Sequence, residues 1–203
     1  MLEVFADVSC PFTHVGLRAA LAERARQGRD DVTLRVHAWP LELVNGAATD
    51  PTTTAAHVAA LRAQVASDLF SGFIAENVPS TTMLALALEA AAYRVDPATG
   101  EAVSLALRDA LFEQGLDISS AVVLRTIAAR WSLSDVVLRD DAPVLAEWRA
   151  GQARGVLGSP HFFCADIDVF CPALDIARDA AGSLTLRRNA AQLREFLGGC
   201  FAR

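Results

Sequence analysis

Apolar and polar residues alternate along the first segment of the chain. The positions on one side are Leu2, Val4, Ala6 and Val8, and those on the other are Glu3, Phe5 and Asp7. A period of two predicts a β-strand. A helical pattern follows over residues 10–26, and residues 32–38 alternate again up to Pro40. Strand, helix and strand of these lengths predict a βαβ unit whose two strands are parallel.

The middle of the chain has helical spacing instead. Five apolar stripes recur at intervals of three and four residues, with turn residues between them. They are Val58, Leu61 and Val65; Leu84, Leu88 and Val95; Val103, Leu107 and Leu111; Leu124, Ile127 and Trp131; and Val144, Leu145 and Trp148. Because no Pro-, Gly- or Ser-rich linker borders this block, we expect residues 50–155 to be a helical insertion that packs on the sheet.

Strand patterns return near the end of the chain. Residues 161–164, 167–170 and 184–186 are short apolar segments that predict strands. A last helix is expected from about Asn189, with an apolar stripe made by Leu193, Phe196, Leu197 and Cys200. The order βαβ, helical block, ββα predicts an α/β fold, with residues 1–49 and 156–203 forming one domain split by the insertion.

Length and charge narrow the classes of function. A chain of 203 residues fits one domain with an insertion. Its 24 acidic against 18 basic residues leave no basic face, which argues against a nucleic-acid partner. The longest apolar segment, residues 83–92, is interrupted by Glu89 and is shorter than the roughly 18 residues of a membrane span. We therefore expect neither nucleic acid nor membrane as a partner.

The four cysteines are too few and too unevenly spaced for a disulfide scaffold. The N-terminus lacks the basic region and cleavage site of a signal peptide, which predicts a cytoplasmic protein with reduced thiols. Cys164, Cys171 and Cys200 are expected to pack in the core, although Cys164 or Cys171 could instead serve Cys10 as a resolving thiol. The spacing of Cys and His residues matches no metal site, so no metal is predicted.

Cys10-Pro11-Phe12-Thr13 is the most informative motif. Proline is favoured at the first helical position, which would make Cys10 the N-cap with the free N–H groups of Phe12 and Thr13 facing its sulfur. Those donors and the helix dipole favour the thiolate and lower cysteine pKa values to roughly 3.5–7.5. Thr13 stands where a C-x-x-C motif has its second cysteine, and its hydroxyl could donate to the thiolate. His14 could share a helix face with the sulfur.

Each of these residues also has a simpler interpretation. Cys10 could be a small buried hydrophobic residue, and His14 an ordinary helix histidine. Asp7 could carry a proton to or from the thiol, but its turn preference favours capping. His37, Trp39 and His57 are interpreted as structural.

A second motif, Gly155-Val156-Leu157-Gly158-Ser159-Pro160, places a proline directly before a predicted strand. Together with Asp7-x-x-Cys10-Pro11-Phe12-Thr13 and the following Gly16, it resembles the DsbA family of thioredoxin-fold proteins over nearly the whole chain. The resemblance implies a thioredoxin-like fold with an all-helical insertion. It also implies that Cys10 is the nucleophile and that Pro160 is a cis-proline packed against its sulfur.

The residue pattern and the resemblance together give the expected site. Cys10, Thr13 and Pro160 are the expected catalytic set, and Pro11, Phe12, His14 and Ser159 are expected to contact substrate. Ser159 would pair with substrate through its backbone, and Phe12 would flank the groove. Because Thr13 replaces the second cysteine, a disulfide cannot form within the motif.

The expected function is therefore that of a thiol–disulfide oxidoreductase with one motif cysteine. Cys10 would form a mixed disulfide with a small or protein disulfide, and a small thiol such as glutathione would release it as co-substrate, with no tightly bound cofactor. One alternative is a small-thiol-dependent transferase or isomerase, similar to kappa-class glutathione transferases and 2-hydroxychromene-2-carboxylate isomerases, which usually have Ser at the Cys10 position. Another is a non-catalytic thioredoxin-fold binding protein, and a homodimer is a further possibility.

Overall fold

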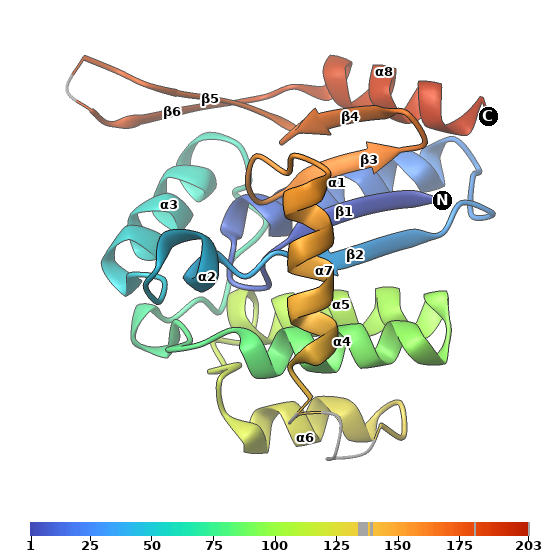
Figure 1. Ribbon diagram of the computed structural model, residues 1–203. Coiled ribbons are helices and arrows are strands. Elements are labelled where there is room, and N and C mark those ends of the chain that lie inside the picture. The colour runs from blue at the N-terminus through green and yellow to red at the C-terminus, as the bar shows by residue number, and fades with distance from the viewer. Residues whose placement is uncertain (134–137, 139, 181, 203) are drawn as a thin grey trace.

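The computed structural model describes residues 1–133, 138, 140–180 and 182–202, and Figure 1 shows their arrangement. In chain order the helices and strands are β1 (Leu2–Ala6), α1 (Pro11–Arg26), β2 (Leu34–Ala38), α2 (Leu41–Asn45), α3 (Pro51–Gln64), the 3₁₀ turn η1 (Ala75–Asn77), α4 (Met83–Val95), α5 (Pro97–Phe112), α6 (Ala121–Ala129), α7 (Ala142–Ala153), β3 (His161–Cys164), β4 (Ile167–Phe170), β5 (Leu174–Arg178), β6 (Leu184–Arg188) and α8 (Ala190–Phe201).

The main sheet has four strands in the order β2-β1-β3-β4. β1 and β2 are parallel, which confirms the predicted βαβ unit, and β3 is antiparallel to both β1 and β4. β5 and β6 form a separate antiparallel hairpin. The sequence predicts β6 but not β5, because four of the five residues of β5 are exposed and lack the expected alternation.

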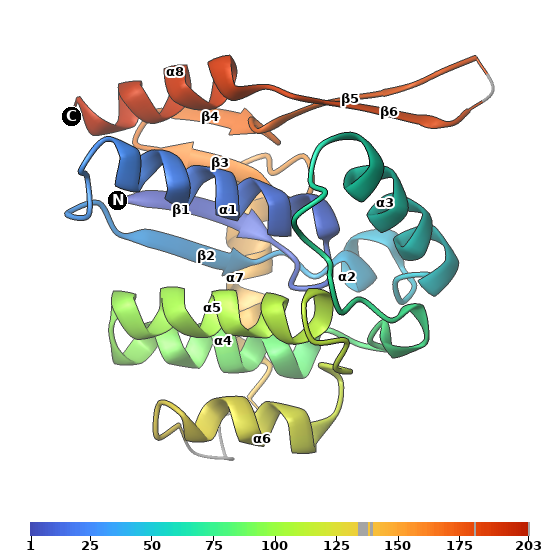
Figure 2. The same cartoon turned by 180° about the vertical axis from the view of Figure 1, so that it is seen from behind.

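Helices cover both faces of the sheet. Figure 1 shows α7 crossing one face, and Figure 2 shows α1 and α8 on the opposite face. On the α7 side Phe5, Trp39 and Phe163 form a small aromatic cluster. A side chain at Gly151 of α7 would lie 2.7 Å from the Trp39 ring, so the glycine allows the helix to pack closely there.

The helical block packs on the sheet, as predicted. α4, α5 and α7 contact β2, and α6 lies against α4 and α5. Most of the predicted stripe residues are buried in one core with the strands. Val95 is an exception, with 61% of its surface exposed, because it is the last residue of α4. Within the described ranges, no helix is long and apolar enough to cross a membrane.

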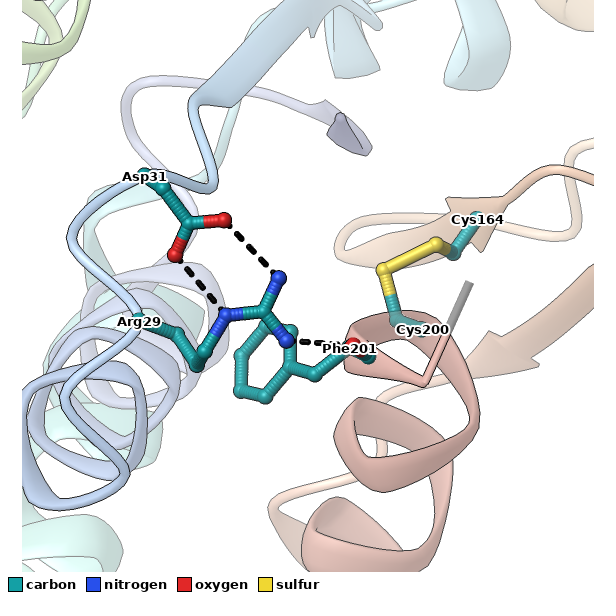
Figure 3. The surroundings of a disulfide bond; sticks show 5 residues. All are labelled: Arg29, Asp31, Cys164, Cys200 and Phe201. Atoms are coloured by element: carbon teal, nitrogen blue, oxygen red, sulfur yellow. Dashed lines mark hydrogen bonds and ion pairs between the residues drawn. A yellow bond between two sulfur atoms is a disulfide. The ribbon is translucent and has the colours of Figure 1, made fainter.

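The C-terminal helix is fastened to the sheet by a disulfide bond. Cys164 at the end of β3 and Cys200 in α8 are joined, with their Cα atoms 5.6 Å apart. Both residues are buried in the core, as predicted, but the expectation that they are reduced was wrong. Both face the core from elements that pack together, which brings them within the Cα separation that a disulfide requires. Figure 3 shows a second contact at the C-terminal end of α8. Arg29 donates to the carbonyl of Phe201 and also pairs with Asp31.

Candidate active site at the start of helix α1

Three helices begin in the same way, with a cap residue followed by proline at the first helical position. Before α3 and α5 the cap is aspartate, and the carboxylates of Asp50 and Asp96 accept backbone N–H groups of their own helices. Before α1 the cap is Cys10, which makes no side-chain capping bond. Its thiol instead donates to the carbonyl oxygen of Ser159 at 3.1 Å. The sulfur therefore has two kinds of polar partner: the Ser159 carbonyl accepts from it, and the backbone N–H of Thr13, one of the donors expected from the sequence, acts to lower the Cys10 pKa.

This placement changes the acidity of the thiol. Only 4% of the surface of Cys10 is exposed. Burial raises the pKa of Cys10 above its ordinary value, the negative charge of Asp7 raises it further, and polar contacts with Thr13 and Ser159 oppose the rise only in part. The predicted lowering of the Cys10 pKa is thus contradicted.

Ser159 is the residue that connects the two motifs. Its hydroxyl lies 2.8 Å from the hydroxyl of Thr13 and accepts the backbone N–H of Asp7 at 2.9 Å. Its carbonyl accepts the Cys10 thiol, and the Ser159–Pro160 peptide bond is cis. The ring of Pro160 lies against α1, where a Cβ atom at Gly16 would stand 3.5 Å from it. Segments far apart in sequence are therefore joined around one sulfur atom.

Asp7 holds the turn that precedes Cys10. Its carboxylate accepts the backbone N–H groups of Ser9 and Leu41 at 2.8 and 2.7 Å, together with the hydroxyl groups of Ser9 and Thr82. Burial raises the pKa of Asp7, and these hydrogen bonds act in the opposite direction. With four donors in place, the carboxyl group has the capping role that its turn preference favoured.

Two cavities open beside Cys10. The first has a volume of about 370 Å³ and is bounded by the start of α1, the residues between α2 and α3, and Ser159. The second, of about 430 Å³, lies under the β5–β6 hairpin and is mostly apolar. Phe12, His57 and Ser159 line both cavities, and the rings of Phe12 and His57 are 5.1 Å apart. The Phe12–His57 pair therefore forms a shared wall.

Most of the predicted site residues are brought together here. Cys10, Pro11, Phe12 and Ser159 line the first cavity. Thr13 and Pro160 are buried, and the Thr13 hydroxyl contacts that of Ser159. Besides Cys10 itself, the structure thus groups Pro11, Phe12 and Ser159 at the first cavity, with Thr13 in contact with Ser159 and Pro160 following Ser159 in the chain.

His14 is the exception. Its ring is buried, lies against Phe70 and Phe112, and is 2.7 Å from a carboxylate oxygen of Glu113. Burial lowers the pKa of His14 although Glu113 opposes this. Its known contacts lie away from both cavities, so we interpret it as a packing residue that links α1 to the end of α5 and do not retain it in the candidate site.

Among the other residues that line the cavities, His57 and Arg178 were not predicted as site residues, and Cys171 was considered only as a possible resolving thiol. His57, interpreted from sequence as structural, belongs to the wall between the cavities, and burial lowers its pKa. Cys171 and Arg178 line the second cavity. Arg178 lies on β5, the strand that the sequence did not reveal, so no local pattern could have placed it. The side chains in the described ranges include no group of three that could hold a metal ion.

Comparison of whole structures defines the fold. The chain superposes on a "probable DsbA oxidoreductase" from Streptomyces coelicolor with a TM-score of 0.70 at 18% identity, covering 100% of this chain and 90% of the other. It superposes on the cytosolic disulfide reductase DsbM from Pseudomonas aeruginosa, solved with GSH, with a TM-score of 0.64 at 15% identity, covering 100% and 99%. A 2-hydroxychromene-2-carboxylate isomerase gives 0.63 at 14% identity, covering 83% and 87%.

These likenesses establish a thioredoxin-like α/β fold of the DsbA type, as the sequence predicted. No protein-family model and no curated protein sequence matches the chain.

Proposed function

We propose that the protein is a thiol–disulfide oxidoreductase in which Cys10 is the nucleophile. The observation that carries the proposal is the position of its sulfur, at the start of α1, on the wall of a cavity and 3.1 Å from the Ser159 carbonyl. The solved structures that share the fold include a disulfide reductase and a DsbA-type oxidoreductase, which is consistent with this chemistry.

In the proposed reaction the Cys10 sulfur attacks one sulfur of a substrate disulfide. A bond forms between Cys10 and that sulfur, the substrate S–S bond breaks, and the proton of the Cys10 thiol ends on the departing thiolate. Thr13 cannot take part in a second exchange, because a hydroxyl forms no disulfide. Its part is to position Ser159 and to favour the thiolate through its contact with Cys10. Pro160 follows Ser159 through a cis peptide bond and packs against α1 at Gly16.

The cavities favour a small or partly apolar disulfide. The second cavity is lined by Phe170, Ile176 and Leu184, with Arg178 as a positive charge at its edge. A glutathionyl group would fit this combination, since it has carboxylates for Arg178 and a chain short enough for a cavity of this size. We propose glutathione, or an equivalent small thiol, as co-substrate, and Pro11, Phe12 and Ser159 as substrate contacts.

The experiment is reduction of a glutathionylated apolar peptide by glutathione, followed through NADPH consumption by added glutathione reductase. The wild type should accelerate release of the peptide thiol, and Cys10→Ser should abolish the acceleration. Phe12→Ala should raise KM more than it lowers kcat, because it removes a wall of the groove and leaves the sulfur in place. Equal rates for the wild type and Cys10→Ser would overturn the proposal.

One observation favours a second candidate, a transferase or isomerase that uses a bound small thiol as cofactor. The Cys10 thiol donates a hydrogen bond to the Ser159 carbonyl, and burial raises its pKa, so it could likewise donate to a cofactor thiolate without forming a covalent bond. The 2-hydroxychromene-2-carboxylate isomerase structure shares the fold. The Cys10→Ser variant distinguishes the two candidate functions, because a serine hydroxyl can still donate a hydrogen bond but cannot form a mixed disulfide.

A cytoplasmic location remains part of the proposal. The cytosolic DsbM is consistent with it. The Cys164–Cys200 disulfide weighs against it, because such bonds are rare where glutathione keeps thiols reduced. The oxidised fraction of this pair in intact cells, trapped by rapid alkylation, tests the location. The homodimer also stays a prediction.

A further inference from the structure

Two cysteines in the chain remain free, Cys10 and Cys171. Both are buried, each with 4% of its surface exposed. The other two cysteines are joined to each other at the end of α8. Two thiols are thus available for chemistry, and they come from distant parts of the sequence.

Both free cysteines form a hydrogen bond with the Ser159-Pro160 dipeptide. The Cys10 thiol donates to the carbonyl of Ser159 at 3.1 Å, and the backbone N–H of Cys171 donates to the carbonyl of Pro160 at 3.0 Å. Consecutive residues have Cα atoms no more than about 3.8 Å apart, so both cysteines are tied to neighbouring points of the same segment. A negative charge on Cys10 also raises the pKa of Cys171, which reflects their proximity.

Both thiols also border the same substrate space. Cys10 lines the first cavity and Cys171 the second, and Phe12 and Ser159 line both. A group bound covalently to Cys10 and lying over Phe12 would therefore extend toward Cys171.

Cys164, the other candidate for a resolving thiol, is placed elsewhere. In the β3–β4 hairpin Cys164 pairs with Ile167 next to the turn, whereas Cys171 lies opposite Pro160 at the open end. Four residues of strand separate the two positions, about 13 Å at 3.3 Å per residue. That is too far for a disulfide between Cys164 and Cys171. Of the two cysteines that flank this hairpin, Cys171 is the one on the side of Cys10.

We propose that Cys171 is the resolving thiol of the Cys10 site and replaces the cysteine that the motif lacks at Thr13. The inference rests on the proposed function, since it begins with the mixed disulfide at Cys10. The Cys171 sulfur attacks the Cys10 sulfur as its proton passes to the departing substrate sulfur, so that a Cys10–Cys171 disulfide forms, the bond between Cys10 and the substrate sulfur breaks, and the second substrate thiol leaves. Two molecules of a small thiol then reduce the Cys10–Cys171 disulfide and leave as one small-molecule disulfide, so electrons balance over the cycle.

The test follows one adduct in the absence of free thiol. Wild type and Cys171→Ala, both reduced, are mixed with oxidised glutathione at about pH 8, desalted, and followed by intact mass and non-reducing peptide mapping. In Cys171→Ala the glutathionyl group should remain on Cys10. In the wild type it should leave, with a lifetime at least about tenfold shorter, as a Cys10–Cys171 peptide pair appears. The same comparison in a Cys164→Ser/Cys200→Ser background keeps the mapping unambiguous.

The outcomes distinguish failure of the Cys171 inference from failure of the proposed function. Equal adduct lifetimes in the two proteins, without the Cys10–Cys171 pair, would overturn the inference and leave the proposed function standing. Absence of any Cys10 adduct in either protein would overturn both. Dibromobimane, which becomes fluorescent when it joins two neighbouring thiols, gives a readout independent of exchange. It should label the wild type and fail with Cys10→Ser and with Cys171→Ala.

Discussion

Arg108 and Glu89 form an ion pair, 2.6 Å apart, that is fully buried between α5 and α4. The same guanidinium donates to the carbonyl and hydroxyl of Ser104, and its other terminal nitrogen lies 3.5 Å from the backbone carbonyl of Asp7. The pair therefore supports the turn that leads into Cys10. It is also the reason that Glu89 can interrupt an otherwise apolar helix.

We predict that Arg108→Met destabilises the protein by about 3–5 kcal/mol, because it leaves the Glu89 carboxylate buried without a partner. Urea denaturation followed by circular dichroism measures this. The double variant Arg108→Met/Glu89→Leu should recover most of the loss, since neither charge then remains. A single variant within about 1 kcal/mol of the wild type would contradict the account of this pair.

The disulfide between Cys164 and Cys200 should contribute to stability. It closes a loop of 36 residues, for which the loss of chain entropy in the unfolded state corresponds to about 3–4 kcal/mol. We expect dithiothreitol to lower the denaturation midpoint of the wild type and to have no effect on Cys164→Ser/Cys200→Ser. If the reductant shifts both proteins equally, the effect does not come from this bond.

Thr13 should make Cys10 more acidic than burial alone would allow. The Thr13 hydroxyl contacts Ser159 and lowers the Cys10 pKa. Thr13→Val removes this hydroxyl, so the Cys10 pKa should rise. We expect slower alkylation of Cys10 by iodoacetamide at about pH 8 and a loss of about 1 kcal/mol in stability. Thr13→Ser, which keeps the hydroxyl, is the matched control and should alkylate at nearly the wild-type rate. Faster alkylation of Thr13→Val would reverse the assigned role.

Stability should fall in alkaline solution. Burial raises the pKa of Cys171 to about 12, and it also raises the pKa of Cys10. The unfolded chain releases these protons near pH 8.5, while the folded chain retains them. The contribution of Cys171 to stability is therefore complete below about pH 8.5 and is lost as the pH rises toward 12, by up to about 1.4 kcal/mol per pH unit, and Cys10 contributes in the same direction.

The contribution of Cys171 to this pH dependence of stability can be measured separately. Denaturation midpoints of wild type and Cys171→Ala between about pH 8 and 10 should converge as the pH rises, because the variant lacks one of the two groups. Parallel lines would mean that Cys171 is not held in the protonated form.

Local patterns were sufficient for most of the architecture. The alternation in residues 32–38 and the apolar segment 161–164 gave strands close to those observed, since buried strands must present apolar side chains. Pro11 placed the start of α1 correctly, because proline suits the first helical position whatever lies around it. β5 was missed because its exposed face has no such constraint.

The chemistry of the site depended on longer-range information. The sequence placed Cys10 at a helix start, but the direction of its thiol is decided by the Ser159 carbonyl, 149 residues later. The pairing of Cys164 with Cys200 likewise required the docking of α8 on the sheet. The position of Cys171 beside the site depended on the register of the β3–β4 hairpin.

The most direct test of the account is whether Cys10 forms a covalent bond with a small disulfide. Reduced wild type, Cys171→Ala and Cys10→Ser are each treated with oxidised glutathione, quenched with acid and mapped by mass spectrometry. The account predicts a glutathionyl group on Cys10 in Cys171→Ala, an exchange product that involves Cys10 in the wild type, and no adduct in Cys10→Ser. An unmodified Cys10 in a protein that still binds glutathione non-covalently would contradict it and favour the thiol-cofactor enzyme.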